Sequence, residues 1–194
     1  MKLMLFTKRQ KRKLFSLLIT VTILGVGYVL NRSTPPPAVM GTVSPGYYKV
    51  ASFEDGDTIT VEMDGKEERI RMIGVDTPET KDPRKPVQCF GKAASNYTKS
   101  LIGDQPVRLE ADALSDNRDR YSRLLRYVYL PDGKLVQAEI IRQGYGFAYT
   151  SFPFTKSDEF RGYANEARAQ NRGLWSTCEP TSNKYGGFTS NPAD

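Results

Sequence analysis

Residues 58–76 read TITVEMDGKEERIRMIGVD, two runs of alternating apolar and polar side chains joined by Asp64-Gly65. Alternation with a period of two is typical of a half-buried β-strand. The apolar positions are Ile59, Val61 and Met63 in the first run and Ile70, Met72 and Val75 in the second. Asp-Gly between two such runs favours the tight turn of a hairpin, so this segment is predicted to form two antiparallel strands.

Three more strands and three helices are expected outside this hairpin. The strands are predicted at residues 48–53, 107–111 and 124–130, and the helices at 90–101, 135–143 and 157–171. Glycine follows each helix closely, as is common at helix ends. Five short strands interrupted and followed by helices predict a mainly β, α+β domain, namely a small Greek-key barrel of the OB type.

The N-terminal part of the sequence indicates export. Residues 14–30, LFSLLITVTILGVGYVL, form an uncharged apolar run after a basic segment, residues 1–13. A run of this length is at the short limit for spanning a bilayer, which takes ~17–25 residues, and with basic residues on its cytoplasmic side it predicts a transmembrane anchor; a cleaved signal peptide is the alternative. Residues 31–46 are expected to be a Pro/Ser/Gly linker, residues 47–177 a domain beyond the cytoplasmic membrane, and residues 178–194 a flexible tail.

Composition removes two common arguments about function. The net charge of +6 does not indicate a nucleic-acid-binding surface, because seven of the 28 basic residues lie in residues 1–32, where there is no acid. Residues 33–194 hold 21 basic against 22 acidic side chains. The sequence also has no histidine, which excludes hydrolases and metal sites that depend on imidazole.

Acidic residues mark a candidate metal site at one end of the predicted hairpin. They are Asp57 in DGDT (55–58), and Asp76 and Glu79 in DTPET (76–80). Hairpin pairing places Asp57 opposite Asp76, and two unpaired carboxylates would repel each other. A hard cation such as Ca²⁺ is therefore expected between them, with a carbonyl near Thr77 as a further ligand. Glu79 would then act on a water beside the metal as general base or orienting group.

Two arginines complete a site for phosphate chemistry. Arg71 lies on the strand that leads to Asp76, and Arg123 lies in DRYSRLLRY (119–127). A guanidinium group binds two phosphate oxygens and stays charged. A metal, a water-orienting carboxylate and two arginines predict hydrolysis of a phosphodiester.

The ordered motifs resemble the staphylococcal nuclease family. The run DGDT is followed by RIRMIGVDTPET (69–80), DRYSR (119–123), RQGYGFAY (142–149) and NRGLW (171–175). The resemblance covers about residues 47–177. It implies an endonuclease that hydrolyses DNA and RNA with little sequence specificity and leaves 3′-phosphate ends.

The resemblance also implies roles for single residues. Ca²⁺ would be held by Asp57, Asp76 and the carbonyl of Thr77, and Glu79 would be the general base or water-orienting group. The scissile phosphate would contact Arg71 and Arg123.

Residues around the nucleotide follow the family less closely. Tyr121 and Tyr149 match tyrosines that line the nucleotide pocket, and Ser122 stands where the family usually has glycine. A basic loop after TPET is represented by Lys81, Arg84 and Lys85, of which Lys81 and Lys85 are the candidate substrate contacts.

The two cysteines flank the helical part of the predicted domain. Cys89 and Cys178 are expected to form a disulfide in an oxidising exterior; the alternative is two free thiols. Closing such a long loop would stabilise the domain by ~3–5 kcal/mol in the chain-entropy model.

These patterns predict an exported, membrane-anchored, calcium-dependent endonuclease. DNA and RNA are its expected partners, no protein partner is implied, and a monomer is expected. Two alternatives stay open: an OB module that binds nucleic acid without cutting it, and a surface interaction domain on the same scaffold. The five residues Asp57, Arg71, Asp76, Glu79 and Arg123 favour the enzyme, because binding alone does not require all of them.

Overall fold

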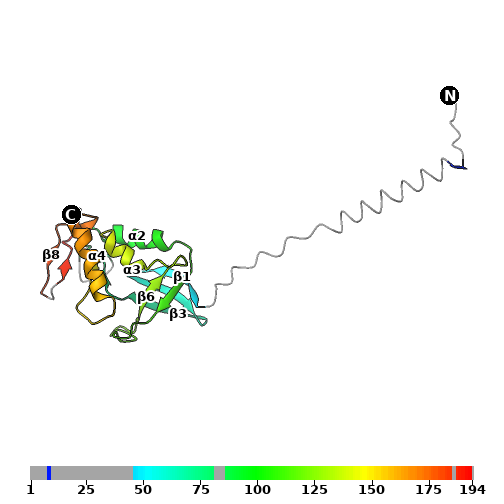
Figure 1. The fold of residues 1–194 in the computed structure, drawn as a ribbon, viewed down its shortest axis with the longest axis horizontal. Coiled ribbons are helices and arrows are strands. Elements are labelled where there is room, and N and C mark those ends of the chain that lie inside the picture. Colours follow the sequence, from blue (N-terminus) through cyan, green and yellow to red (C-terminus); the bar gives the residue numbers. More distant parts are fainter. Residues whose placement is uncertain (1–7, 10–45, 81–85, 185–186, 194) are drawn as a thin grey trace, which may run out of the picture. The chain divides into compact units, whose positions relative to one another are not determined.

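The computed structural model describes residues 8–9, 46–80, 86–184 and 187–193. The chain divides into two units, Met1–Thr42 and Val43–Asp194, and the second carries the fold (Figure 1). The predicted anchor, residues 14–30, lies outside the described residues. Among those that are described, no helix has the length and apolar character needed to span a bilayer.

Five strands close into a barrel in the order β1-β2-β3-β6-β5. The strands are β1 (Tyr47–Phe53), β2 (Thr58–Met63), β3 (Lys66–Met72), β5 (Val107–Glu110) and β6 (Leu124–Tyr129). Strands β3 and β6 pair in parallel, and the other neighbours pair antiparallel. The predicted five-stranded barrel is therefore confirmed.

The register of the β2–β3 hairpin sets the position of the site. Met63 pairs with Lys66 beside the turn, and Thr58 pairs with Arg71 at the open end. The turn residues Asp64 and Gly65 have φ of 51° and 75°, the left-handed conformation that a two-residue hairpin turn needs. The open end of the hairpin thus carries Arg71 next to the DGDT segment.

Alternation along the hairpin also supplies the core. The side chains of Ile59, Val61, Ile70 and Met72 are fully buried inside the barrel. Burying four such side chains contributes roughly 1.5–3 kcal/mol each. This packing holds the hairpin in one register, because a shift by one residue would expose them all.

Helices cover one side of the barrel (Figure 1). They are α2 (Gly91–Ile102), α3 (Val136–Arg142), α4 (Ser157–Ala169) and the short α5 (Leu174–Thr177). The three longer helices match the predicted ones, and α5 is additional.

The second strand of the hairpin is shorter than predicted. It ends at Met72, and Val75 instead belongs to β4 (Val75–Asp76), which pairs with β7 (Phe147–Ala148). The break lies at Gly74, whose φ is 74°; a Cβ there would lie 2.6 Å from the Phe154 ring. A tight turn under a packed aromatic ring therefore redirects the chain toward Asp76.

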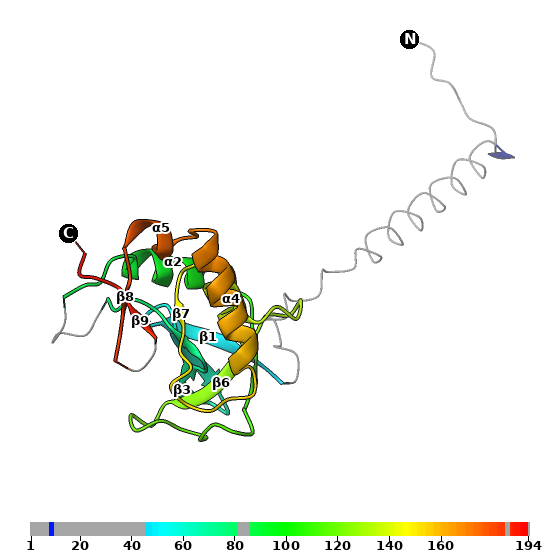
Figure 2. The same cartoon turned by 60° about the vertical axis from the view of Figure 1, so that its left-hand side comes forward.

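Residues 178–184 and 187–193, which were predicted to be part of a flexible tail, contain two short strands. Strands β8 (Thr181–Ser182) and β9 (Phe188–Thr189) form a small hairpin beside the helical side (Figure 2). A disulfide joins Cys89 to Cys178, with Cα atoms 5.7 Å apart. Backbone hydrogen bonds and this cross-link hold the segment in place. It can therefore be ordered with little apolar periodicity in its sequence.

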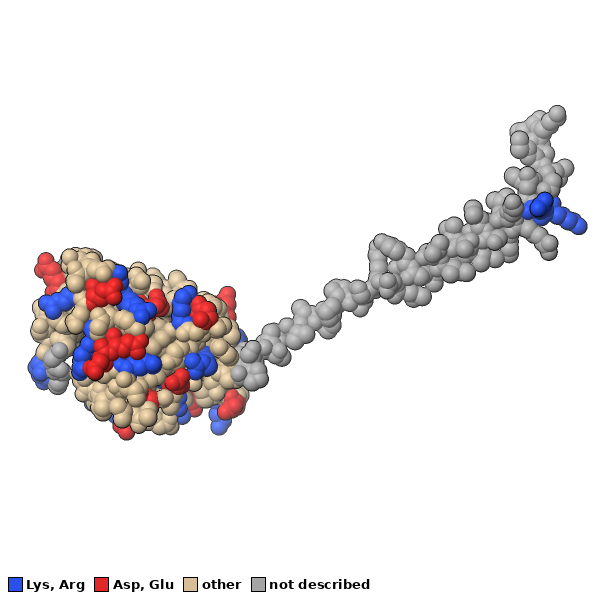
Figure 3. Space-filling view, in the orientation of Figure 1, with Lys and Arg blue, Asp and Glu red and all other residues tan. Residues whose placement is uncertain are grey.

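Charges are mixed on the face of this unit that Figure 3 shows. On the face shown in Figure 3, acidic and basic side chains alternate without a large area of one sign. This agrees with the near-balanced charge of residues 33–194, so binding of an anionic polymer must depend on local placement of cations.

Candidate active site

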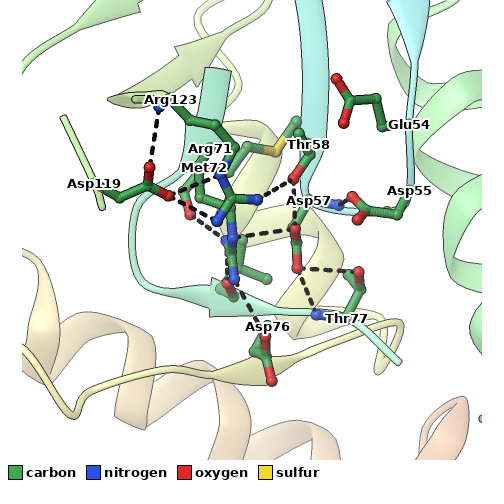
Figure 4. A network of polar contacts seen from close by, with 12 residues as sticks. Glu54, Asp55, Asp57, Thr58, Arg71, Met72, Asp76, Thr77, Asp119 and Arg123 are labelled. Carbon is green, nitrogen blue, oxygen red and sulfur yellow. Dashed lines mark hydrogen bonds and ion pairs between the residues drawn. The ribbon is translucent and has the colours of Figure 1, made fainter. Parts of the chain in front are cut away.

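Arg71 lies between two carboxylates at the open end of the hairpin (Figure 4). Its Nε is 3.3 Å from Oδ1 of Asp57, and its Nη2 is 3.2 Å from Oδ1 of Asp76. The hairpin register and the turn at Gly74 together produce this arrangement. One guanidinium thus links the two residues predicted to bind a metal.

Asp57 also connects the DGDT segment to the segment after β4. Its Oδ2 accepts hydrogen bonds from the backbone N–H of Thr77 (2.8 Å) and from the Thr77 hydroxyl (3.1 Å). A Cβ on Gly56 would lie 2.8 Å from the Thr77 side chain, so the two segments can meet this closely only with glycine there. Asp57 is 4% exposed, and its carboxylate orientation is therefore fixed.

Arg71 is positioned by backbone as well as by charge. Its Nη1 donates to the carbonyl oxygens of Met72 and Val75, both at 2.7 Å. Burial by itself would lower the pKa of Arg71, but the charges of Asp57 and Asp76 outweigh burial and raise it. The guanidinium therefore stays charged.

Arg123 reaches the same network through Thr58. Its Nη1 donates to the Thr58 hydroxyl (3.3 Å), and that hydroxyl donates to Oδ1 of Asp57 (3.0 Å). The parallel pairing of β3 with β6, which begins one residue after Arg123, brings the two arginines to one end of the barrel. Figure 4 shows both guanidinium groups beside the Asp57–Thr58 segment.

Asp119, which sequence reasoning missed, positions Arg123. Its Oδ2 lies 2.7 Å from both Nε and Nη2 of Arg123, and its Oδ1 accepts the backbone N–H groups of Tyr121 and Arg123. Burial would raise the pKa of Asp119, but the hydrogen bonds and charge of Arg123 lower it. The acid four residues before Arg123 in DRYSR was the signal that could have identified it.

Asp55 is a second acid that the sequence analysis did not single out. Burial and the neighbouring charge of Asp57 raise the pKa of Asp55 to about 7. Burial is the larger of these two causes of the raised pKa. The repeated aspartate in DGDT was the available signal.

Glu79 lies on the segment that follows Thr77. Its Oε1 accepts the backbone N–H of Thr80 (2.8 Å), and its own N–H donates to Oε1 of Gln88 (2.7 Å). Hydrogen bonds with Thr80 and Gln88 thus hold Glu79. Its predicted role with water stays a prediction.

The predicted substrate contacts differ in how far the structure places them. Tyr121 is 54% exposed, and the Arg123 guanidinium carbon lies 5.4 Å from its ring centre. The backbone N–H of Tyr149 donates to the Gly74 carbonyl (2.8 Å). Lys81, Arg84 and Lys85 lie outside the described residues.

The donor set suits a hard cation but is small. In the part of the chain that the structure describes, no three His, Cys, Asp or Glu side chains converge as a metal-binding group. The available oxygens are the carboxylates of Asp57 and Asp76 and backbone carbonyls nearby. Carboxylate and carbonyl oxygens are the ligands that Ca²⁺ requires.

The protein is a closed five-stranded barrel that carries arginines and carboxylates at the open end of one hairpin. This places it in the class of domains whose side chains are suited to binding phosphate. The family model described as "Staphylococcal nuclease homologue" matches residues 69–177. The chain belongs to this family.

Individual relatives are similar over most of the folded unit. The thermonuclease of Staphylococcus hyicus is 37% identical over 158 residues, which cover 80% of this chain and 91% of that protein. The thermonuclease of Staphylococcus intermedius is 42% identical over 123 residues, 63% of this chain and 70% of its own length. Endonuclease YncB of Bacillus subtilis is 42% identical over 132 residues, 67% and 62% respectively.

Proposed function

We propose that this protein is a calcium-dependent endonuclease that hydrolyses DNA and RNA with little sequence specificity. Family membership and the names of the relatives support a nuclease. The observation that carries the proposal is the junction of Arg71 and Arg123 through Asp57 and Thr58. Two guanidinium groups that contact the same Asp57–Thr58 pair, beside oxygen donors for a cation, are suited to bind one phosphodiester group.

The arginines would bind the substrate and offset transition-state charge. Asp57, Asp76 and Asp119 orient the two guanidinium groups before the substrate arrives. The phosphate oxygens would then compete with these carboxylates for the guanidinium N–H groups. Such preorganised donors stabilise the negative charge that develops during attack on phosphorus. Because their orientation is fixed by the fold, little free energy is spent on reorganisation.

Glu79 would take the proton of the attacking water or orient that water. Attack on phosphorus with departure of the 5′ oxygen gives a 3′-phosphate and a 5′-hydroxyl end. Tyr121, exposed beside Arg123, is placed to contact the nucleotide next to the phosphate.

Asp57, Asp76 and the carbonyl of Thr77 would hold the calcium ion. When bound, Ca²⁺ supplies positive charge close to the phosphate and the attacking water. Asp57 is fixed by Thr58 and Thr77, whereas the Asp76 side chain is 49% exposed and contacts Arg71. This chain would therefore bring one rigid and one accessible carboxylate to the ion.

The protein would act beyond the cytoplasmic membrane, with residues 1–13 inside and the run 14–30 as a single-pass anchor. The basic segment before an uncharged apolar run supports this orientation. Cleavage of the run as a signal peptide would release the domain instead.

A plasmid-nicking assay tests the function. Oxidised protein should nick supercoiled DNA with Ca²⁺ and stop on addition of a chelator, and Glu79→Gln should lose about 10²-fold in kcat while its circular dichroism is unchanged. Arg161→Ala, which removes an exposed arginine paired with Asp158, is the matched control and should cut normally. Binding of DNA without metal-dependent cutting would favour a binding module, and absence of binding would favour an interaction domain.

A further inference from the structure

Gln88 holds the backbone of Glu79 on both sides. Its side-chain Oε1 accepts the N–H of Glu79 (2.7 Å), and its own backbone N–H donates to the Glu79 carbonyl (2.9 Å). Both polar groups of the Glu79 peptide therefore depend on one residue nine positions later.

The same side chain is held from its other end by residues 188–193, here called the C-terminal strap. Its Nε2 donates to the Ser190 carbonyl (3.1 Å) and to the Thr189 hydroxyl (3.4 Å). An amide that bonds at both its oxygen and its nitrogen has a fixed orientation. Gln88 thus connects the strap directly to Glu79.

The strap runs along the segment that contains Gln88. The Cys89 N–H donates to Asn191 O, the Ala193 N–H donates to Val87 O, and the Ser190 hydroxyl donates to Cys89 O, each at 2.8 Å. Ser190 is only 3% exposed. These bonds make the strap a brace for residues 87–89.

Hydrogen bonds to both cysteines of a disulfide, together with an aromatic cluster, fasten the strap to the helical side. Cys89 is bonded to Cys178, whose carbonyl accepts a hydrogen bond from the Asn191 side chain (3.2 Å). Phe188 packs with its ring centre 5.0 Å from that of Trp175. The strap is therefore fixed at its start by packing and along its length by hydrogen bonds, some of them to the two disulfide-bonded cysteines.

Helix α2 closes the remaining side. A Cβ on Gly91 would lie 2.9 Å from the Glu79 carbonyl oxygen and 2.7 Å from the Thr80 side chain. The start of α2 thus abuts the segment of Glu79 with no space between them, and a shift of residues 88–91 must move Glu79.

We infer that Gln88 is a positioning residue for Glu79, and that the strap and the Cys89–Cys178 disulfide keep Gln88 in place. This inference rests on the proposed function, because it assigns a support to the residue that handles water. If the disulfide keeps Gln88 in place, reduction of the disulfide should lower the turnover of the nuclease. A small dithiol would give two electrons and two protons to the disulfide, yielding two cysteine thiols and its own cyclic disulfide.

The test is a double-mutant cycle on kcat with a defined oligonucleotide and Ca²⁺. Gln88→Leu should lower kcat by about 10–10²-fold with KM little changed, since misplacement of a catalytic group by about 1 Å costs this much. In a Glu79→Gln background the same substitution should change kcat less than about twofold, because Gln88 acts through Glu79. A purely structural role would give equal losses in both backgrounds and would overturn the inference.

A matched control and a second route keep the outcome clear. Gln170→Leu removes an exposed amide that bonds Glu166 and should leave kcat unchanged. Dithiothreitol should lower kcat of the native protein by about tenfold, as a looser support for Glu79 predicts, and should not affect the Cys89→Ser/Cys178→Ser variant, which is expected to be slow already. If the oxidised native protein does not cut, the proposed function fails; if it cuts and neither Gln88→Leu nor reduction slows it, only this inference fails.

Discussion

The β2–β3 hairpin and the C-terminal strap both hold residues of the candidate site, but over different distances along the chain. The hairpin places Asp57 beside Arg71 through a register fixed within Thr58–Met72. The strap reaches Gln88 from residues 101 and 102 positions away. Asp57 and Arg71 are thus brought together by local pairing, whereas the support of Glu79 depends on contacts between distant parts of the chain.

The largest expected effect comes from the hairpin side. Arg71→Lys keeps a positive charge between Asp57 and Asp76 but loses the forked donor, so kcat should fall by about 10²–10³-fold. The fall should exceed that of Gln88→Leu, because Arg71 would contact the reacting phosphate and Gln88 would not. Single-turnover kinetics on the same oligonucleotide would measure both, and a smaller loss for Arg71→Lys would reverse the ranking of the two regions.

The free energy of unfolding should depend on pH through a carboxyl group at the hairpin end. The strap should not contribute, because it contains no carboxylate side chain. The pKa of Asp55, about 7 in the folded protein, is above its unfolded value of about 3.9. A raised carboxyl pKa favours the protonated group in the fold, so stability without metal should decrease as pH rises from about 4 to 7.

Asp55→Asn should remove this dependence and raise the free energy of unfolding at pH 8 by on the order of 1–2 kcal/mol. Urea unfolding at pH 5 and pH 8 with a chelator present would measure it. An unchanged difference between the two pH values in Asp55→Asn would mean that another group titrates.

The smallest expected effect concerns the loop that carries Arg123. Ser122 has φ of 64°, a conformation that favours glycine. Ser122→Gly should raise the free energy of unfolding by about 0.5–1 kcal/mol without loss of activity.

Ser100→Gly, at an exposed position inside α2, provides the opposite control and should destabilise by about 0.5–1 kcal/mol. Thermal unfolding of both variants measures the difference. Equal signs for the two substitutions would show that Ser122 carries no backbone strain.

Sequence patterns were sufficient where neighbouring residues decide the structure. The alternation in 58–72 and the Asp64-Gly65 turn define a hairpin whose open end brings Arg71 to Asp57, because β-pairing fixes register locally. The ordered motifs likewise identified the family that the comparisons show. The roles of Asp57, Arg71, Asp76, Glu79 and Arg123 remain predictions.

Only the tertiary structure decided the rest. The break at Gly74 depends on an aromatic ring from Phe154. The sequence of the strap predicts no regular structure, because its residues have no periodic apolar face. The strap is ordered by hydrogen bonds to a segment about a hundred residues earlier, and such non-local contacts leave no pattern in a single sequence.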